Sequence, residues 1–438
     1  MIHVLMRYIG IKTKLLPYIK EEIKKVTPKD GCVLDMFAGS TIVGQSLMPQ
    51  FLIYSNDIQK YSWAVGKATI ETDKNFDYSS LSYKKVVASP YFQDNFAFLL
   101  SIFKEPYDYE KALFKKLENN PSLDVLLEFK KYYDCTPYSG HFNSDDVPLC
   151  FKKISSYFSN SFYEKCKKDK KHYLLFTLDY SCPYFSTEQA MFIDSFRFAI
   201  DQMLANKEIS FVEFYAYLSY LIFYLGSIVT SVGDHFAQPQ QLKLSTEKRL
   251  QKEVKKIILK KNVNIDALLT DLESQFRSIK PSKRDNKMFC EDYKRLFESD
   301  YSLYMDKVNT IYIDPPYTNA HYSRFYHILE TLVKYDYPDI EFFGRYRSDR
   351  YQSPFCIRSE ALIEFEKMIE LCCKRNKNLV ISYSDTAQCI LSKEEVVNIC
   401  KKWYSKTSIK EIDYLYRNFG QKPNKVKGNE LLIVCRAN

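Results

Sequence analysis

Short apolar runs that stop at a polar residue predict buried β-strands near both ends of this 438-residue chain. The runs and the polar residues that end them are 32–34 with Asp35, 51–55 with Asn56, and 310–313 with Asp314. A glycine turn after the first strand leads into a predicted helix at residues 42–48. Strands that alternate with helices in this way are typical of an α/β fold with a largely parallel sheet.

The middle of the chain shows the apolar spacing of amphipathic helices instead. The predicted helices cover residues 108–132, 187–205, 211–231, 247–261 and 265–279. Ser186 and Gln189 form a capping-box pair at the start of one of them. We therefore expect an α/β three-layer sandwich built from residues 1–75 and 305–438. A mainly helical insert at residues 76–304 is expected to interrupt it.

Residues 214–233 carry no charged side chain over 20 positions, which is the length of a bilayer-spanning helix. Tyr, Ser and Thr residues interrupt the apolar pattern, and Glu213 and Asp234 bound the segment. A helix buried in protein is therefore expected, and no membrane is predicted as a partner.

Composition narrows the class of partner and the compartment. The formal net charge of +9 favours an anionic partner, and 36 Tyr and 31 Phe residues offer surfaces on which bases can stack. The 12 Cys residues include no CxxC pair, and no secretory apolar region opens the chain. Reduced thiols in a cytoplasmic protein are expected, and no zinc or other metal site is predicted.

The most informative short stretch is Asp314-Pro315-Pro316-Tyr317, directly after a predicted strand. Ligands in open α/β sheets sit at the carboxyl ends of strands. The Asp314 carboxylate and the Pro315 carbonyl are two adjacent acceptors that can hold both hydrogens of an amino group and leave its lone pair free. Tyr317 offers a flat face for a ring that bears this amine. The stretch therefore predicts a planar heterocyclic substrate with an exocyclic amine.

Further polar and glycine positions near the N-terminus indicate a second ligand. Gly10 precedes Lys12, which can meet a carboxylate or a phosphate. The turn that contains Gly39 brings backbone N–H groups towards a ligand, and Asp57 is placed for ribose hydroxyls. The absence of a GxGxxG motif disfavours a dinucleotide. A ligand with an amino-acid end and a nucleoside end fits better.

The order of these motifs resembles the Dam-like class of DNA adenine-N6 methyltransferases. The motifs that carry the resemblance are Arg7-Tyr-Ile-Gly-Ile-Lys12, Asp35-Met-Phe-Ala-Gly39, Asn56-Asp57 and Asp314-Pro-Pro-Tyr317. The resemblance covers residues 1–75 and 305–438. Residues 379–385 and 430–434 are similar to later strands of that class, and residues 314–330 are similar to its restriction-modification members.

The resemblance implies a Rossmann-like methyltransferase fold with S-adenosylmethionine as cofactor. Lys12 and the turn at Gly10 would lie near the methionine end, Asp35 would face the amino group, and Asp57 would face the ribose. Phe37, Ala38 and Gly39 would contact the nucleoside, and Tyr8 and Ile58 complete the cofactor-binding set. Asp314, Pro315, Pro316 and Tyr317 would hold a flipped adenine for direct methyl transfer.

Two departures leave the loop geometry and the contact of Lys12 open. Ile11 stands where the class often has a second glycine, and Ser40-Thr41 replaces a run of glycines.

Basic segments in and after the insert are candidates for DNA phosphate contact. They are residues 165–171, 252–261, Lys280, Lys283 and Arg284, and the Arg- and Tyr-rich segment 345–358. His235, His321 and His327 lack partners of a metal site and are expected to be structural or close to DNA.

The function expected from the sequence is site-specific methylation of adenine N6 in duplex DNA, within a restriction-modification or similar defence system. A cognate restriction endonuclease is a second expected partner. The alternatives are an RNA adenine methyltransferase and a catalytically silent DNA-binding protein that retains the fold. The missing phosphate fingerprint disfavours a nicotinamide enzyme.

Overall fold

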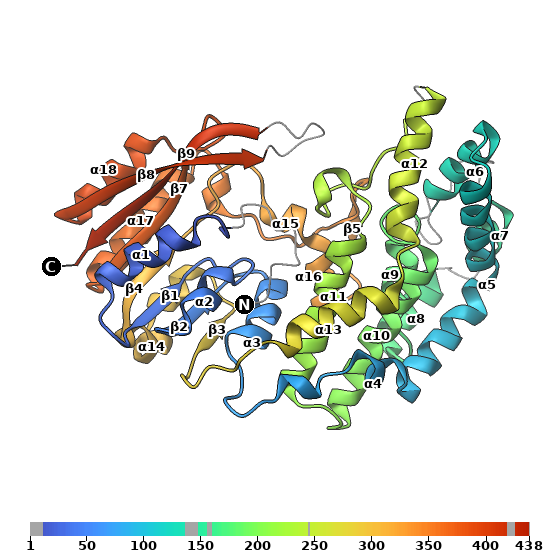
Figure 1. Cartoon of the computed structure of the whole chain (residues 1–438), viewed down its shortest axis with the longest axis horizontal. Helices are drawn as coiled ribbons and strands as arrows, with labels where there is room; N and C mark the ends of the chain where they lie inside the picture. The colour runs from blue at the N-terminus through green and yellow to red at the C-terminus, as the bar shows by residue number, and fades with distance from the viewer. Residues whose placement is uncertain (1–11, 136–147, 156–159, 244–245, 418–424, 438) are drawn as a thin grey trace. The chain divides into compact units, whose positions relative to one another are not determined.

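The computed structural model describes residues 12–135, 148–155, 160–243, 246–417 and 425–437 (Figure 1). The chain divides into two compact units. Unit 1 consists of Met1–Tyr78, Ser278–Tyr326 and Arg350–Asn438, and unit 2 consists of Ser79–Arg277 and His327–Asp349.

Among the described residues, seven strands of unit 1 form one sheet in the order β3-β2-β1-β4-β7-β9-β8. The strands are β1 Cys32–Asp35, β2 Leu52–Asn56, β3 Lys287–Phe289, β4 Val308–Ile313, β7 Asn378–Asp385, β8 Lys406–Arg417 and β9 Lys425–Arg436. Strands β3, β2, β1, β4 and β7 pair in parallel, whereas β9 runs antiparallel to both β7 and β8. The predicted α/β fold with a mostly parallel sheet is confirmed.

Alternate side chains along the buried strands cover opposite faces of this sheet. Val33, Tyr312 and Val380 pack on one face with residues of α1 (Leu16–Val26) and α2 (Ile42–Leu47). Leu34, Ile311, Ile313, Leu379 and Ile381 pack on the other face, together with residues of α14 (Ser302–Lys307), α17 (Ala361–Lys374) and α18 (Lys393–Trp403). Helices therefore cover both faces, and unit 1 is a three-layer sandwich (Figure 1).

The remaining short elements of unit 1 surround the carboxyl ends of the parallel strands or join the strands. They are α3 Lys60–Thr69, η1 Tyr78–Ser80 at the chain boundary with unit 2, η3 Tyr293–Phe297, η4 Ser299–Tyr301, α15 Tyr322–Phe325 and η5 Pro354–Cys356.

Unit 2 is mainly helical. Its elements are α4 Tyr83–Val87, α5 Pro90–Asn119, α6 Leu123–Tyr133, α7 Leu149–Ser155, α8 Asn160–Asp169, α9 Leu175–Asp179, α10 Thr187–Ala205, α11 Phe211–Ile228, η2 Val232–Asp234, α12 Glu247–Lys261, α13 Ile265–Arg277, α16 His327–Lys334, and the strands β5 Ile340–Glu341 and β6 Tyr346–Arg347. The capping box of Ser186 and Gln189 is confirmed at the start of α10.

One predicted helix, at residues 108–132, is wrong. Helix α5 ends at Asn119, and α6 begins at Leu123. Asn120 has an extended backbone with φ −154° and ψ 92°, and Pro121 follows. A residue before proline is disfavoured in the helical region, so the apolar periodicity continues across a break in the backbone.

Helix α11 covers most of the uncharged segment examined above. By length and composition this helix could cross a membrane. However, 67% of its most apolar 18-residue stretch is buried inside the protein. The side chains from Ala216 to Gly226 are all buried within the structure. The expected burial of this helix is therefore observed.

The boundaries between the units differ from the predicted ones by the short segment 76–78, which belongs to unit 1, and by two longer segments. Residues 278–304 belong to unit 1, because β3 pairs with β2 at the edge of the main sheet. Residues 327–349 belong to unit 2, where the Nε2 atom of His327 lies 2.9 Å from the carbonyl oxygen of Phe236. The guanidinium of Arg197 also donates to the carbonyl of Leu332 in this unit.

Candidate active site

The site of unit 1 lies where two neighbouring parallel strands end. Strands β1 and β4 pair directly, and the N–H of Met36 donates to the carbonyl of Tyr312 at 3.0 Å just beyond β1. On one side of this pair the order continues to β2, and on the other side to β7. Such a reversal in strand order opens a crevice at the carboxyl ends, which places Asp35 and Asp314 beside each other.

A cavity of about 1030 Å³, open solvent included, lies at this place. The lining residues are Lys12, Asp35, Phe37, Ala38, Gly39, Ser40, Ile42, Val43, Asn56, Asp57, Ile58, Gln59, Glu291, Asp292, Tyr293, Tyr312, Asp314, Pro316, Tyr317, His321, Tyr322, Ser323, Tyr351, Ser353 and Phe355.

Asp57 fixes the glycine loop after β1. Its two carboxylate oxygens accept hydrogen bonds from the N–H groups of Gly39 and Gln59, each at 2.8 Å. Gly39 has φ +49°, a left-handed conformation that glycine adopts without strain. Burial raises the pKa of Asp57, and these two N–H groups oppose the rise. Asp57 therefore shapes the loop, and its carboxylate lines the cavity, where it can accept from a ligand hydroxyl.

Asp35 is a buried carboxylate with an unused acceptor. It is 1% exposed. Its Oδ2 accepts a long hydrogen bond of 3.3 Å from the N–H of Gly44, whereas Oδ1 has no hydrogen-bond partner among the described residues. Burial, followed by the charge of Asp314, raises the pKa of Asp35 to about 8. A buried orphan acceptor is costly, so this position calls for a cationic or N–H-bearing ligand.

Asp314 lies beside a buried cation. The Nζ of Lys12 is 3.1 Å from Oδ1 of Asp314 and 2.8 Å from Oε1 of Glu430, a residue of β9. Burial raises the pKa of Asp314 to about 6, with Lys12 opposing this rise and Glu430 adding to it. The two carboxylates raise the pKa of Lys12 well above its usual value, although burial lowers it. Lys12 therefore contacts carboxylates of the protein at the edge of the cavity.

Aromatic rings form the walls of the cavity. Phe37 meets Phe355 edge to face with ring centroids 5.6 Å apart, and Tyr293 lies 5.7 Å from Phe355. On the Asp314 side, Tyr317 packs edge to face against Tyr383 at 5.7 Å. The carbonyl of Tyr317 accepts from the N–H of Ile390 at 2.9 Å, which fixes the backbone after the two prolines. These walls suit flat aromatic ligands.

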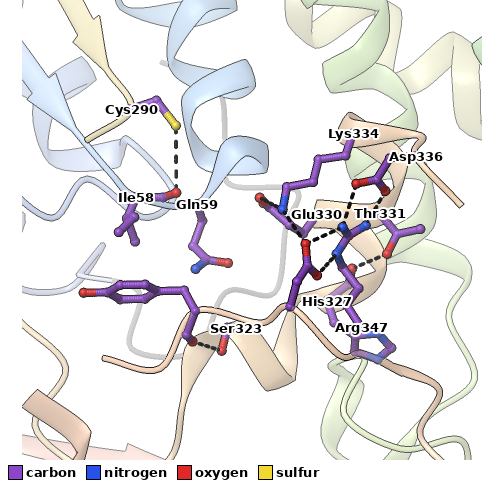
Figure 2. Close-up of polar contacts among 12 residues, drawn as sticks. Ile58, Gln59, Cys290, Ser323, His327, Glu330, Thr331, Lys334, Asp336 and Arg347 are labelled. Carbon is purple, nitrogen blue, oxygen red and sulfur yellow. Dashed lines mark hydrogen bonds and ion pairs between the residues drawn. The ribbon is translucent and has the colours of Figure 1, made fainter. Parts of the chain in front are cut away.

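Short polar contacts hold the rims of the cavity (Figure 2). The thiol of Cys290 lies 3.8 Å from the carbonyl oxygen of Ile58, and the hydroxyl of Ser323 donates to the carbonyl of Tyr351 at 2.6 Å. His321 lines the same cavity, where burial and the charge of Arg350 lower its pKa. His321 is thus neutral at neutral pH.

Most of the predicted site residues come together around this one cavity. Its lining includes Lys12, Asp35, Phe37, Ala38, Gly39, Asp57, Ile58, Asp314, Pro316 and Tyr317. Pro315 is buried and is not part of the lining, so its role as an acceptor stays a prediction. Tyr8 and Gly10 lie outside the described residues. Within the described ranges, no cluster of three or more His, Cys, Asp or Glu residues could hold a metal ion.

The sequence missed Glu430 and the aromatic residues Tyr293, Tyr322, Tyr351 and Phe355. The signal for Glu430 was available, because it is a lone acid at the start of an apolar run, Glu430-Leu-Leu-Ile-Val434. A charge at an otherwise buried position requires a partner. Tyr322 lies in the noted segment 314–330, and Tyr351 and Phe355 lie in the segment 345–358 that was predicted to contact DNA. Of these four aromatic residues, only Tyr293 reaches the cavity from a segment without a noted motif.

The predicted phosphate contacts of the segment 345–358 need correction for two arginines of unit 2. The side chain of Arg347 is 2% exposed and pairs with Asp336 at 2.6 Å, as Figure 2 shows, and with Asp349 at 2.9 Å. The guanidinium of Arg345 donates to the carbonyl of Asp179. Both groups are therefore engaged inside the unit. Arg358 is exposed and keeps its expected role as a candidate.

Comparisons with known proteins agree with the motifs and the site. Residues 8–144 match the sequence model of the D12 class N6 adenine-specific DNA methyltransferases. The chain is 26% identical over 431 residues to the type II methyltransferase M.FokI of Planomicrobium okeanokoites, which covers 97% of this chain and 51% of that protein.

Two further relatives are modification methylases. LlaI of Lactococcus lactis subsp. lactis is 23% identical over 99% of this chain and 55% of its own length. StsI of Streptococcus sanguinis is 24% identical over 97% of this chain and 50% of its own length. The chain thus spans about half the length of these relatives. The family match and the relatives agree with the resemblance read from the motifs: the chain is similar to D12 class N6 adenine-specific DNA methyltransferases and to modification methylases.

Proposed function

We propose that this chain transfers a methyl group from S-adenosylmethionine to the exocyclic N6 amine of adenine in duplex DNA, at a specific site and within a restriction-modification system. The observation that carries the proposal is the placement of Asp35 and Asp314 at the ends of the neighbouring strands β1 and β4, where both line one aromatic-walled cavity. One acid faces a site for a cationic cofactor, and the other faces a site for a flat amine.

The residues present fit the proposed cofactor. The orphan oxygen of Asp35 is an acceptor for the ammonium group of the methionine end. The Asp57 carboxylate at the cavity suits ribose hydroxyls, and Phe37 and Phe355 offer surfaces for the adenine ring of the nucleoside. When bound, the cofactor supplies an electrophilic methyl group on a sulfonium sulfur.

The proposed roles at the reacting amine follow from the charges and rings at the end of β4. With a pKa of about 6, Asp314 is ionised at neutral pH and accepts a hydrogen bond from the amine. Its charge stabilises the positive charge that develops on nitrogen during transfer. Tyr317 supplies a stacking surface for the base. Because the amine is inaccessible within a duplex, the base is flipped out of the stack.

Helix α12 of unit 2 supports DNA as the partner and unit 2 as the recognition unit. Lys248, Lys252, Lys255 and Lys256 are exposed and lie on one face, opposite the buried Leu250, Val254 and Ile257. None of these four lysines forms an ion pair with a described residue. The two acids of the helix, Glu247 and Glu253, lie off this face by helical geometry. Such a face suits a row of phosphates.

The test is incubation of the full chain with methyl-labelled S-adenosylmethionine and either duplex DNA of mixed sequence or RNA. Label is expected on N6 of adenine in DNA. Label in RNA alone favours the RNA methyltransferase. Cofactor binding without transfer to either nucleic acid favours the silent DNA-binding protein, and the absence of both binding and transfer contradicts the proposal.

A further inference from the structure

We infer that Glu430 is a positioning residue for methyl transfer, which acts through Lys12: it holds the ammonium that orients the Asp314 carboxylate, and its negative charge compensates that of the ammonium. The inference rests on the proposed function of Asp314. It concerns a residue that lies two strands away from Asp314 and that was not among the predicted site residues.

The geometry forms a continuous polar connection across the strand ends. Glu430 is fully buried in β9, and its Oε1 accepts a hydrogen bond from Nζ of Lys12 at 2.8 Å. The hydroxyl of Ser382, on the intervening strand β7, donates to the same oxygen. The same Lys12 ammonium lies 3.1 Å from Oδ1 of Asp314. Ser382 and Glu430 therefore fix the position of the ammonium that contacts Asp314.

The backbone also restrains Lys12. Its carbonyl accepts from the N–H groups of Leu15 at 2.8 Å and Leu16 at 3.0 Å, in the turn that leads into α1. The Lys12 side chain is only 6% exposed. Because the backbone carbonyl and the ammonium group of Lys12 are both held, Lys12 does not move with Asp314. The ammonium is therefore a fixed counter-ion rather than a mobile one.

The charges of this cluster decide what Asp314 can do. Lys12 is a cation that contacts both carboxylates. Glu430 is the closer and more buried carboxylate, and a buried carboxylate is strongly destabilised without its cation. Glu430 thus compensates the charge of Lys12, and the remaining negative charge resides on Asp314 at the cavity. Without Glu430, Lys12 and Asp314 would form a neutral pair, which would stabilise a developing cation less.

The contact also orients Asp314. Among the described residues, Lys12 is its ion-pair partner and approaches Oδ1. With Oδ1 held in this way, Oδ2 remains for the substrate amine. Positioning of an acceptor relative to the reacting atom contributes directly to the rate of such a reaction.

The first experiment is a titration that does not depend on methyl transfer. The groups that face Asp314 are Lys12, Glu430, Asp35, Tyr312, Tyr317 and Tyr322. The carboxyl carbon of Asp314 is followed by NMR in full-length protein labelled with 13C-aspartate, and Asp314→Asn identifies its signal. Glu430→Gln removes one negative charge, so the titration midpoint of Asp314 is expected to move to lower pH. An unchanged or higher midpoint overturns the inference.

The second experiment is single-turnover methylation of duplex DNA. Glu430→Gln is expected to slow the transfer step by roughly 10- to 100-fold, as losses of supporting contacts around a reacting group do. Cofactor and DNA affinities are expected to stay within a few-fold of the parent, and the acidic limb of the pH–rate profile should move to lower pH. A normal rate with only a lower melting temperature would show a structural role and overturn the inference.

Two further variants keep the result interpretable. Glu411→Gln removes an exposed carboxylate of the neighbouring strand β8 and is expected to leave rate and titration unchanged. If Glu430 acts through Lys12, Glu430→Gln should lower the rate of methyl transfer only slightly in a protein that already carries Lys12→Met. Additive losses of rate in the double variant would contradict the proposed connection. The double variant also removes both buried charges together, which protects folding. If the parent methylates no DNA, the proposed function fails, while the carboxyl titration still decides the role of Glu430.

Discussion

Two carboxylates in the same cavity have different surroundings at the level of single residues. Asp314 has a cation at 3.1 Å, whereas Asp35 has one long hydrogen bond from a backbone N–H. The pKa values of about 6 for Asp314 and about 8 for Asp35 follow from this difference. At neutral pH Asp314 is therefore ionised in the free protein, and Asp35 is mostly protonated until a cation binds.

The rate of methyl transfer is expected to decrease as the pH falls below about 6. Asp314 must be ionised to accept the amine hydrogen, and its pKa is raised to about 6, so protonation removes the acceptor as the pH decreases through that value. The pH dependence of kcat/KM measures this limb. Asp314→Asn should lose about 100- to 1,000-fold in rate while it keeps cofactor binding. Equal loss of cofactor binding would contradict the assigned role.

Cofactor binding is expected to release a proton near pH 7. The pKa of Asp35 is raised to about 8 in the free site, and a bound ammonium group lowers it, so the carboxyl loses its proton on binding. Calorimetric titration in buffers of different ionisation enthalpy measures the release. Asp35→Asn should abolish the proton release and weaken cofactor binding. A release that persists in this variant would assign the proton to another group.

The carboxyl group of Asp35 should also make the stability of the free protein decrease as the pH rises. A folded-state pKa of about 8 lies above the usual value near 3.9, so the folded chain binds the proton more tightly than the unfolded chain does. The resulting stabilisation is present at low pH and is lost as the pH rises towards 8. Asp35→Asn should therefore raise the melting temperature more at pH 8.5 than at pH 5, with Glu411→Gln as the control.

The sequence predicted the acids at the strand ends but not the partner that controls one of them. Asp35 and Asp314 follow apolar runs directly, and Asp57 follows such a run after Asn56, so their place at the sheet edge follows from local pattern. Lys12 and Glu430 are separated by 418 positions, and only the strand order brings them together. A single sequence contains no local signal for such a pair.

At the level of elements, helix α12 combines a packed face with a cationic one. A DNA-binding role for this face gives a quantitative expectation, because each phosphate contact contributes about 0.9 to the slope of log affinity against log salt. The double variant Lys252→Gln with Lys256→Gln should lower this slope by about 2 and should weaken binding to all DNA sequences equally. Affinity measured from low to moderate salt tests this.

The matched control uses lysines of unit 2 that already have partners. Lys104 pairs with Asp108, and Lys153 pairs with Glu105, on exposed surfaces. Lys104→Gln with Lys153→Gln removes the same charge and should change the slope far less. Equal effects of the two pairs would show that only net charge matters, and that α12 has no special contact.

Helix boundaries were predictable where capping and periodicity agree. Helices α10 and α12 match their predicted ranges, and both have a capping side chain at the residue before the helix. The error at residues 108–132 arose because the spacing of apolar residues alone does not reveal the break in the helix at Asn120 and Pro121. Strand β3 has three residues and was missed, because so short a run carries no periodic signal.

At the level of the whole molecule, the two units can be observed separately. The only two tryptophans of the chain, Trp63 and Trp403, both belong to unit 1, whereas most helical residues belong to unit 2. S-adenosylhomocysteine, as a probe of the cofactor site, should raise the unfolding midpoint measured by tryptophan fluorescence more than that measured by circular dichroism at 222 nm. Identical shifts would mean that the units unfold as one.

The sequence could not predict how often the chain passes between the units. A motif-based division assigns everything after residue 305 to the catalytic domain, yet residues 327–349 contribute to the helical core of unit 2. Buried contacts such as that of Arg197 with the carbonyl of Leu332 decide this membership. These contacts are long-range and depend on tertiary packing.

The position of β4 between β1 and β7 has a consequence for biosynthesis. During translation β1 and β2 leave the ribosome first, but the central neighbour of β1 is made only after residue 307. The continuous segment 79–277 emerges in the meantime and is rich in local helical contacts, which form fast. Most helices of unit 2 should therefore form first on the nascent chain, whereas residues 327–349 of that unit and the strand end that carries Asp314 are added only when the last third has been synthesised.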